Sequence, residues 1–494
     1  MSQNIPQGTM LGHPKGLFLL FTTEMWERMS YYGMRGIFVL YLTTVATAAA
    51  MGWDMSYFGI DPKMPGAEEA YQNALSSNAL SYLGTYAFLV YVTPVFGGWF
   101  ADNVAGQRKS IILGGVIMAL GQFALGTPHS LIPGMEHEFL MLGLALLIIG
   151  NGFFKPNIST MVGDLYKEGD HRRDGAFTIF YMGINLGSIL GYFVVGSIGE
   201  KIDYQYGFIT AGIGLLIGVV LQLALSNKYL GSIGTVPSAK MSSGNDAVTA
   251  NKKPLTHEER DRIKVILIMS FFTIIFWAGF EQAAGSMNLF AKYKTDLVFF
   301  GWEMPASWLQ SVNPLFILIL APIFASTWIR MGEKEPDSPR KFALGMLFLG
   351  LGFISMVGAA LQIGDSETAK AHVIWLVMAY IFHTMGELCL SPIGLSMVSK
   401  LAPLKYTSLL MGMWFFFSGV GNYAAAEIGK LVGEAGPLGT FAGVAIMAFV
   451  AGFCLWLLAD RLIDWMHGAE SKAHNVEAEI AVTADHEAMR KSHD

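Results

Sequence analysis

The chain has 494 residues, of which 53% are hydrophobic and only 14% are charged, and its mean hydropathy is +0.45. Soluble domains carry about 25% charged residues, so this composition excludes an ordinary soluble protein and indicates an integral membrane protein. The net charge of −6 says little, because in membrane proteins the distribution of charge between loops matters more than its sum.

Twelve helical membrane spans are predicted, because apolar runs close to the ~20 residues that a bilayer requires recur along the chain. The first six lie near residues 16–47, 75–100, 110–128, 138–162, 175–199 and 206–226. The second six lie near residues 265–289, 308–328, 342–363, 371–398, 407–428 and 437–459. These are long helical runs and lack the short alternating pattern of a membrane barrel.

A polar segment separates the two sets of spans. Residues 227–264 are rich in Ser, Gly, Asn and Lys, which is typical of a linker. Residues after about 466 form a charged tail without an apolar run. We therefore predict an all-α membrane protein with an N-terminal half (1–226), a linker (227–264), a C-terminal half (265–465) and a polar tail (466–494).

The placement of the 32 Lys and Arg residues predicts the orientation of the chain in the membrane. When the N-terminus is assigned to the cytoplasm, few of them fall in loops on the other side: Lys63, Lys201, Lys292, Lys294, Lys370 and Lys430. Cytoplasmic loops are enriched in Lys and Arg, so we expect both termini in the cytoplasm, in a multi-pass protein of the inner or plasma membrane.

The two halves resemble each other, since a short loop ending in a basic pair follows the second and the eighth span. Two six-helix halves joined by a cytoplasmic linker are the architecture of the major facilitator superfamily. The first of these loops, GGWFADNVAGQRKS, resembles that superfamily's signature, although its spacing from Asp to Gly is one residue longer than usual. We expect this loop to hold cytoplasmic helix ends together.

Seven ionisable side chains fall inside the predicted spans, where each costs roughly 2.5–3.5 kcal/mol. They are Glu24, Glu27, Arg28, Arg35, Lys155, Glu281 and Glu387. The four on the first span share one helical face with Tyr31 and Tyr32, within an arc of about 140°. Such a face points into protein or a water-filled cavity. It is interpreted either as a structural ion-pair lattice or as a polar pathway.

Local pairing explains part of this set. Glu24 and Arg28 are four residues apart and can pair on one helix, whereas Arg35, Lys155, Glu281 and Glu387 have no local partner. The cations belong to the N-terminal half and the carboxylates to the C-terminal half. A cavity between them suits a zwitterion such as an amino acid or a peptide, with its carboxylate toward the first half and its amine toward the second.

Several motifs together resemble the proton-dependent oligopeptide transporters of the major facilitator superfamily. The run E-x-x-E-R-x-x-Y-Y-G at residues 24–33 resembles their first-helix signature. The stretches FFKPNIST, FTIFYMGINLGS, FWAGFEQ, NPLFI and GELCLSPIGLSMVSKLAP resemble their motifs on helices 4, 5, 7, 8 and 10. The match spans roughly residues 15–460.

The resemblance implies symport of di- and tripeptides with protons by alternating access, and it implies a role for each matching residue. The peptide carboxylate would be bound by Arg35, Lys155 and Asn185. The amine would be bound by Glu387 and Asn313. Side-chain pockets would be lined by Tyr31, Tyr32, Tyr86, Tyr181, Trp277, Trp414 and Ser418. Proton coupling would involve Glu24, Glu27, Arg28 and Glu281. The outer gate would be the pair Arg35–Glu281 and the inner gate the pair Lys155–Glu387.

The sequence departs from the family pattern in a few places. Met29 replaces the usual Phe, and Leu83-Gly84-Thr85 occupies the place where some members have a histidine, which excludes a histidine switch there. His383 is interpreted as a packing residue. The linker is too polar and short for the two extra helices of many bacterial members, which favours twelve spans.

Other function classes have less support. A carrier of the same fold for other zwitterions, peptide-like drugs or nitrate stays an alternative. The sequence lacks a nucleophile beside a base, a metal-spaced His/Cys cluster and a phosphate-binding loop, so we expect no enzyme activity, no cofactor and no metal. The expected partners are small peptides, protons and the lipid bilayer, without nucleic acid, and the expected functional unit is a monomer.

Overall fold

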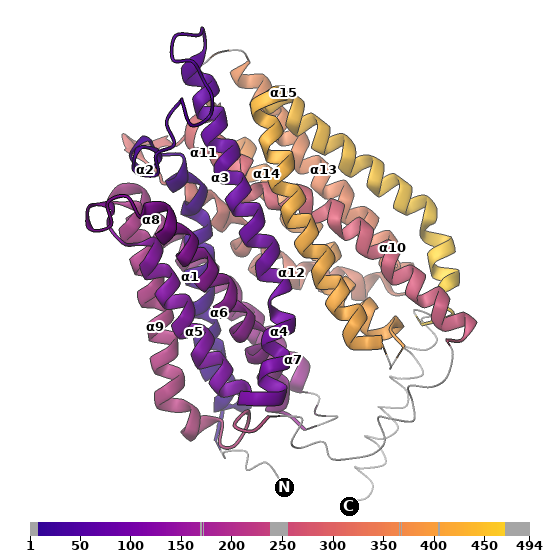
Figure 1. The fold of residues 1–494 in the computed structure, drawn as a ribbon. Helices are drawn as coiled ribbons and strands as arrows, with labels where there is room; N and C mark the ends of the chain where they lie inside the picture. Colours follow the sequence, from indigo (N-terminus) through magenta and orange to yellow (C-terminus); the bar gives the residue numbers. More distant parts are fainter. Residues whose placement is uncertain are drawn as a thin grey trace, which may run out of the picture.

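The computed structural model describes residues 8–167, 170, 172–237, 255–364, 366, 368–403 and 406–469. The middle of the predicted linker (238–254) and nearly all of the predicted tail lie outside these residues. The described chain is mostly helical, and Figure 1 shows its two ends on the same side of the molecule.

The helices follow the order of the predicted spans. The N-terminal half contains α1 (Lys15–Leu42), α2 (Val45–Ala50), α3 (Ala67–Val92), α4 (Pro94–Phe100), η1 (Ala101–Ala105), α5 (Gln107–Leu125), η2 (His129–Leu131), α6 (Glu136–Asp164), α7 (Arg172–Leu190), η3 (Gly191–Val195), α8 (Gly196–Lys201) and α9 (Tyr204–Tyr229). The C-terminal half contains α10 (His257–Phe280), η7 (Glu281–Ala283), α11 (Ser286–Lys294), η8 (Ala306–Ser311), α12 (Val312–Met331), η9 (Gly332–Lys334), α13 (Ser338–Ile363), α14 (Ile374–Leu401) and α15 (Thr407–Trp465).

Short strand pairs occur in loops. Strands β1 (Thr9–Met10) and β2 (His13–Pro14) are antiparallel, as are β4 (Val298–Phe299) and β5 (Trp302–Glu303). Strands β3 (Thr295–Asp296) and β6 (Ala371–His372) are parallel. Helix α9 continues to Tyr229 and α10 begins at His257, so the helices extend into the predicted linker from both sides.

Ten helices or helix runs of the described chain are long and apolar enough to cross a membrane. Helix α1 is not one of them, because the five charged residues on its 28 residues exceed what an apolar span tolerates. The 59 residues of α15 count once, although its backbone breaks at Gly436 (φ 70°) before Pro437 and Figure 1 shows the helix turning back. All twelve predicted segments lie on helices, while the number of spans stays a prediction.

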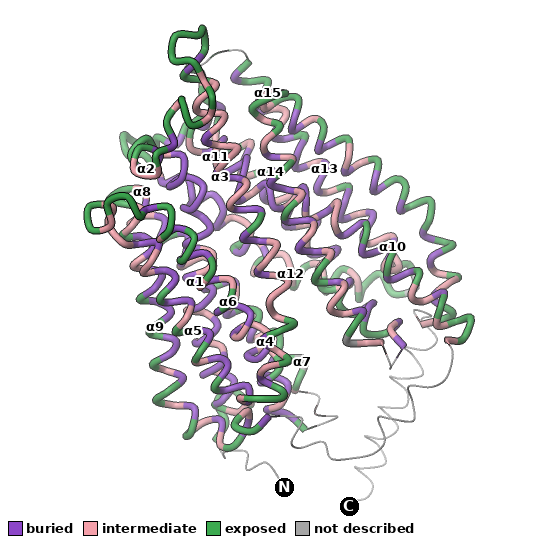
Figure 2. Tube along the Cα trace, viewed as in Figure 1, coloured by how far each residue is buried: buried purple, intermediate pink, exposed green. Residues whose placement is uncertain are grey.

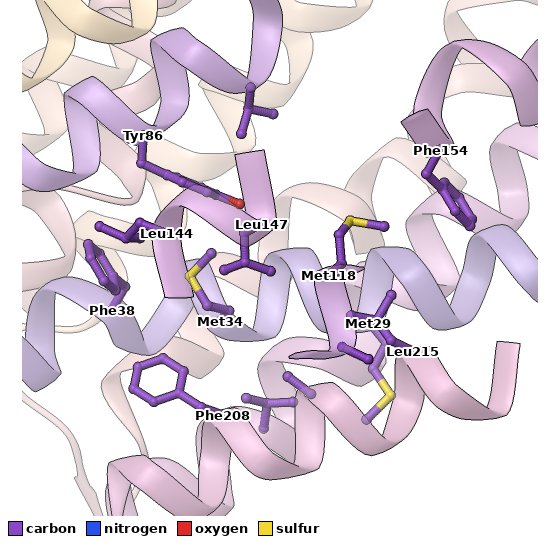
Figure 3. Close-up of a cluster of buried hydrophobic side chains, with 14 of the residues drawn as sticks. Met29, Met34, Phe38, Tyr86, Met118, Leu144, Leu147, Phe154, Phe208 and Leu215 are labelled. Atoms are coloured by element: carbon purple, nitrogen blue, oxygen red, sulfur yellow. The ribbon is translucent and has the colours of Figure 1, made fainter. Parts of the chain in front are cut away.

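Each half has its own hydrophobic core. Figure 3 shows side chains from five helices of the N-terminal half pointing toward one another: Met29, Met34, Phe38, Tyr86, Met118, Leu144, Leu147, Phe154, Phe208 and Leu215. A second cluster packs α10, α13, α14 and α15 in the C-terminal half. Figure 2 shows buried residues where helices meet and exposed residues on their outer faces, where many large hydrophobic side chains lie. This is the pattern of a multi-pass membrane protein.

The halves meet along α3 with α15 and along α7 with α12. At Gly84 of α3, an added Cβ would lie 2.4 Å from the Cβ of Ala426 on α15, so this crossing requires glycine. Close packing of this kind joins the halves at the crossing of α3 and α15, and α7 packs against α12 at a second place.

The loop before α5 joins helix ends as predicted. Arg108 donates to Asn227 Oδ1 at 3.1 Å and to the carbonyl of Gly231 at 2.5 Å, which connects the start of α5 to the end of α9. Gly106 has a φ of 80°, and an added Cβ would lie 2.9 Å from the carbonyl oxygen of Gly234. Glycine is required here by both conformation and space.

Candidate functional site

A cavity of about 100 Å³ lies between the two halves. A water molecule needs about 10–15 Å³ on this measure, so the cavity holds several waters or part of a small polar ligand. The N-terminal half contributes Arg28, Tyr31, Tyr32, Arg35, Tyr91, Lys155 and Tyr192. The C-terminal half contributes Trp277, Phe280, Glu281, Ala283, Ala284, Gln310, Asn313, Tyr380, His383 and Glu387.

One end of the α1 face is an ion-pair network. Arg28 Nε lies 2.9 Å from Glu24 Oε1 and 2.5 Å from Glu27 Oε2, and all three residues are buried. Asn151 of α6 donates to Glu27 Oε1 at 3.5 Å. The expected Glu24–Arg28 pair is therefore present, and a single guanidinium is shared by two carboxylates.

Arg35 forms a buried ion pair with Glu281 of the other half, 246 residues away in sequence. Arg35 Nη1 lies 3.5 Å from Glu281 Oε1, and Nη2 contacts Oε2 more closely. Helix α10 ends at Phe280, and the 3₁₀ turn η7 that follows places Glu281 at the cavity. The contact joins the two halves through opposite charges.

Lys155 is a half-buried cation at the cavity wall. It precedes Pro156 within α6, and its Nζ lies 4.9 Å from the centroid of the Tyr91 ring, close enough for a cation–π contact. Among the described residues, no carboxylate oxygen lies within 4.0 Å of this Nζ. The ammonium group is therefore available to an anionic ligand.

Glu387 of α14 faces the same cavity from the C-terminal half. Asn313 Nδ2 donates to Glu387 Oε2 at 2.9 Å and to Thr384 Oγ1 at 3.1 Å, so the expected proximity of Asn313 and Glu387 is present. Within the described ranges no Lys, Arg or His nitrogen lies within 4.0 Å of this carboxylate. The predicted pair Lys155–Glu387 is thus not formed in this structure.

The aromatic predictions divide into two groups. Tyr31, Tyr32 and Trp277 line the cavity. Five other candidates do not line it: Tyr86, Tyr181, Asn185, Trp414 and Ser418. Their assignment to ligand binding stays a prediction.

Each of these five residues has a different environment. Tyr86 is buried 6.4 Å from the Tyr31 ring, centroid to centroid. Tyr181 is 40% exposed, and Asn185 donates to its carbonyl at 2.9 Å. Trp414 packs against Phe342, and Ser418 donates to the Trp414 carbonyl at 3.1 Å. Two of these contacts are hydrogen bonds within a single helix, and the other two are contacts between aromatic rings.

The cavity also includes residues that are not among the predicted site residues: Tyr91, Tyr192, Phe280, Gln310, Tyr380 and His383. His383 was interpreted as packing; its ring does pack 4.9 Å from Phe353, but it also lines the cavity. Helical spacing back from Glu387 would have found His383 and Tyr380, which lie about one and two turns earlier. Tyr192 lies in the π-helical turn η3, where the extra residue per turn changes the direction in which the following side chains point. No pattern in the sequence indicated this turn.

Further polar contacts join the halves at the end of the cavity that Arg35 and Glu281 close. Glu200 of α8 lies 3.1 Å from Lys292 Nζ and accepts the backbone N–H groups of Ala306 and Ser307 at 3.1 and 2.9 Å. Asn288 of α11 donates to the Gly36 carbonyl at 2.8 Å. This end lies away from the chain termini (Figure 1).

A charged cavity between two helical halves, closed by polar contacts at one end, defines a membrane transporter. The chain belongs to the POT family, whose model matches residues 108–230 and 222–438. Members of this family are transporters and not enzymes, so the chain is assigned to the transporters.

Individual relatives cover nearly the whole chain. It is 34% identical to an uncharacterized transporter of Bacillus subtilis and 32% identical to a di-/tripeptide transporter of Lactococcus lactis subsp. cremoris; each alignment covers 94% of this chain and 98% of the relative. It is also similar to a crystal structure of a POT peptide transporter in complex with sulfate. The TM-score is 0.80 at 34% identity, with 94% of this chain and 98% of that chain covered.

Proposed function

We propose that this protein is a proton-coupled symporter of di- and tripeptides that works by alternating access. The observation that carries the proposal is a pair of half-buried charges, Lys155 and Glu387, which face one cavity from opposite halves and have no ionic partner among the described residues. The names of the peptide-transporting relatives support the same substrate class.

A peptide zwitterion matches the charges of the cavity. Its carboxylate lies toward Lys155. It also lies toward Arg35 once Arg35 is released from Glu281. Its amine lies toward Glu387, whose carboxylate is held in place by the amide of Asn313. The rings of Tyr31, Tyr32 and Trp277 provide apolar walls that accept varied side chains without reading them closely.

In the proposed mechanism, protonation of Glu281 controls the Arg35–Glu281 ion pair and thereby the closure of this end of the cavity. While Glu281 is ionised, the pair joins the halves. A proton on Glu281 removes the attraction and frees Arg35, because a neutral carboxylic acid no longer balances the guanidinium. The buried carboxylates Glu24 and Glu27, which share Arg28, form the second group in the proposed coupling.

The proposed function includes a membrane location, an oligomeric state and an orientation. We place the protein in the inner or plasma membrane as a monomer, with both termini in the cytoplasm, on the distribution of Lys and Arg. The closed end away from the termini then faces outward, and the cavity belongs to an inward-facing state.

Proteoliposome uptake tests this function. Labelled alanyl-alanine should accumulate above equilibrium only when an inward proton gradient is imposed, and unlabelled di- and tripeptides should compete with it. Free amino acids, nitrate and peptide-like drugs form the other arm of the competition. Stronger competition by one of these than by peptides would replace the peptide with that ligand, and accumulation without the gradient would remove proton coupling.

A further inference from the structure

A cluster of three side chains lies outside the transport cavity, where α10 begins and α15 ends. His257 and Asp261 belong to the first turns of α10, and His467 follows the last residue of α15. Figure 1 shows the yellow end of α15 beside the start of α10, on the side of the molecule that holds both termini. In the sequence, His257 and Asp261 fall in the last part of the predicted linker and His467 in the first part of the predicted tail.

Both imidazoles meet the same carboxylate oxygen. His257 Nδ1 lies 3.1 Å from Asp261 Oδ2, and His467 Nε2 lies 3.0 Å from the same atom. One possible ligand atom from each of the three residues lies within 4.8 Å of the others. In a tetrahedral Zn²⁺ site with bonds of about 2.0–2.2 Å, neighbouring ligand atoms are roughly 3.3–3.5 Å apart, so a small adjustment admits an ion.

The surrounding structure fixes the backbone that carries these side chains. His257 and Asp261 are four residues apart and share one face of α10, whose first turn is fixed by a capping box between Thr256 and Glu259. His467 has a φ of 49°, which is uncommon for a residue other than glycine. Arg262 supports this conformation by donating to the Met466 carbonyl at 3.2 Å.

The carboxylate divides its two oxygens between different partners. Lys264 Nζ lies 2.9 Å from Asp261 Oδ1, which leaves Oδ2 to the two imidazoles. Asp261 is 3% exposed, whereas the side chain of His257 is 88% exposed. The cluster therefore has a buried anionic base and an open side toward solvent, where water completes the coordination of an ion.

We propose that His257, Asp261 and His467 form a binding site for a divalent transition-metal ion, of which Zn²⁺ is the representative. Two imidazole nitrogens and one carboxylate oxygen are ligands that Zn²⁺ takes in proteins, with a fourth position left to water. The bound ion fastens the start of α10 to the end of α15. It stabilises the C-terminal half in the folded state by mass action, as does any ligand that binds only that state.

Metal titration of the full-length, tag-free protein in detergent tests the site. With Co²⁺ as probe, we expect the visible absorption of a four-coordinate ion at about one equivalent, displaced by Zn²⁺. The variants His257→Ala and His467→Ala should each weaken Zn²⁺ binding at least about tenfold in calorimetry, since each loses a ligand. The side chain of His257 is exposed, so its substitution leaves the fold intact, which size-exclusion chromatography checks.

The matched control replaces the histidines of the C-terminal tail, His474, His486 and His493, with alanine. We expect this variant to bind Zn²⁺ as the wild type does. Retained binding in His257→Ala, loss of binding in the tail variant alone, or no binding to the wild type would each overturn the proposal.

A thermal readout separates a shared metal from simple hydrogen bonds between the imidazoles and Asp261. Zn²⁺ should raise the Tm of the wild type and leave that of His257→Ala unchanged. An equal rise in both proteins would contradict the site. Because these measurements need neither peptide nor proton gradient, their failure leaves the proposed transport function standing.

Discussion

The two ends of the space between the halves differ in how their charges are satisfied. At the end away from the termini, Arg35 pairs with Glu281, and Glu200 holds Lys292 and two backbone N–H groups of the other half. Toward the other end, Lys155 and Glu387 face each other's half with no ionic partner among the described residues. Ion pairs and hydrogen bonds between the halves thus close one end. At the other end, the charges are available to a ligand.

The difference shows how a carrier can alternate with few moving parts. A buried charge without a partner is costly in a membrane, whereas an ion pair between the halves relieves that cost. In the proposed cycle the same four side chains exchange partners. When one end is closed, the cation and the carboxylate at that end pair with each other. When that end is open, both of them are free to bind the peptide. The following substitutions test whether the two ends have these separate roles.

The largest effect is expected at the fastened end. Glu281→Gln keeps the size of the side chain but removes its charge and its capacity to carry a proton. We expect gradient-driven accumulation of alanyl-alanine in proteoliposomes to be lost, while counterflow exchange, which needs no net proton movement, continues. Accumulation at the wild-type level would show that Glu281 does not couple the proton.

At the other end, removal of either unpaired charge should weaken peptide binding. Lys155→Gln and Glu387→Gln should each lower the affinity for alanyl-alanine roughly 30-fold. This factor corresponds to ~2 kcal/mol of binding free energy, the smallest loss expected when one partner of a desolvated charge pair is removed. Competition of labelled uptake measures the affinity.

Blocked peptides serve as the control for this pair of variants. An N-acetylated peptide has no amine, so Glu387→Gln should not weaken its binding further. A peptide with an amidated C-terminus should in turn be insensitive to Lys155→Gln. If both variants lowered all affinities equally, the two charges would not read opposite ends of the peptide.

A smaller effect is expected from Glu200, which fastens the closed end without lining the cavity. Glu200→Gln weakens the contact with Lys292 and removes the acceptor of one backbone N–H, together worth about 1 kcal/mol. It should therefore raise the population that is open at that end about fivefold. The rate at which an impermeant maleimide modifies Gln310→Cys from outside reports this opening, with the exposed Cys454 replaced by serine.

Glu427→Gln is the matched control for Glu200→Gln. Glu427 pairs with Lys430 at 2.7 Å within α15, so its loss leaves the contact between the halves unchanged. An equal modification rate in the Glu200 and Glu427 variants would remove Glu200 from the closure.

The smallest effect compares two tryptophans of the C-terminal half. Trp277 lines the cavity, whereas Trp414 packs against Phe342. Trp277→Phe should change the affinity for peptides with large side chains about threefold, as expected for the loss of one aromatic contact. Trp414→Phe should leave that affinity unchanged and lower the Tm, because it opens a void in packed helices. The reverse pattern would move Trp414 to the ligand site.

The sequence predicted the charges of the site better than its aromatic walls. Buried charges are so costly in a membrane that their positions alone indicate a cavity, and Arg35 with Glu281 is the expected pair. Tyr86 and Tyr91 of α3 show the opposite case, since the cavity includes Tyr91 and not Tyr86. A helix that is apolar all round carries no signal for which face meets a neighbour.

The fold followed the apolar runs, because their length is fixed by the bilayer. The turns that interrupt helices were not predicted. The 3₁₀ turn at Glu281 and the π-helical turn that holds Tyr192 depend on contacts between distant segments. The cluster of His257, Asp261 and His467 was missed for the same reason: residues 206 positions apart meet only in the folded chain.

The shared guanidinium of Arg28 has an electrical consequence. Glu24 and Glu27 together have one cation between them, while the other two carboxylates at the cavity, Glu281 and Glu387, are matched in number by two cations, Arg35 and Lys155. The empty, deprotonated interior therefore carries one negative charge in excess, which a bound proton cancels and a zwitterionic peptide leaves unchanged. One elementary charge moved across the membrane is worth about 2.3 kcal/mol per 100 mV. In the proposed cycle the loaded carrier is electrically silent, and an interior-negative membrane potential drives the empty binding site back toward the outside.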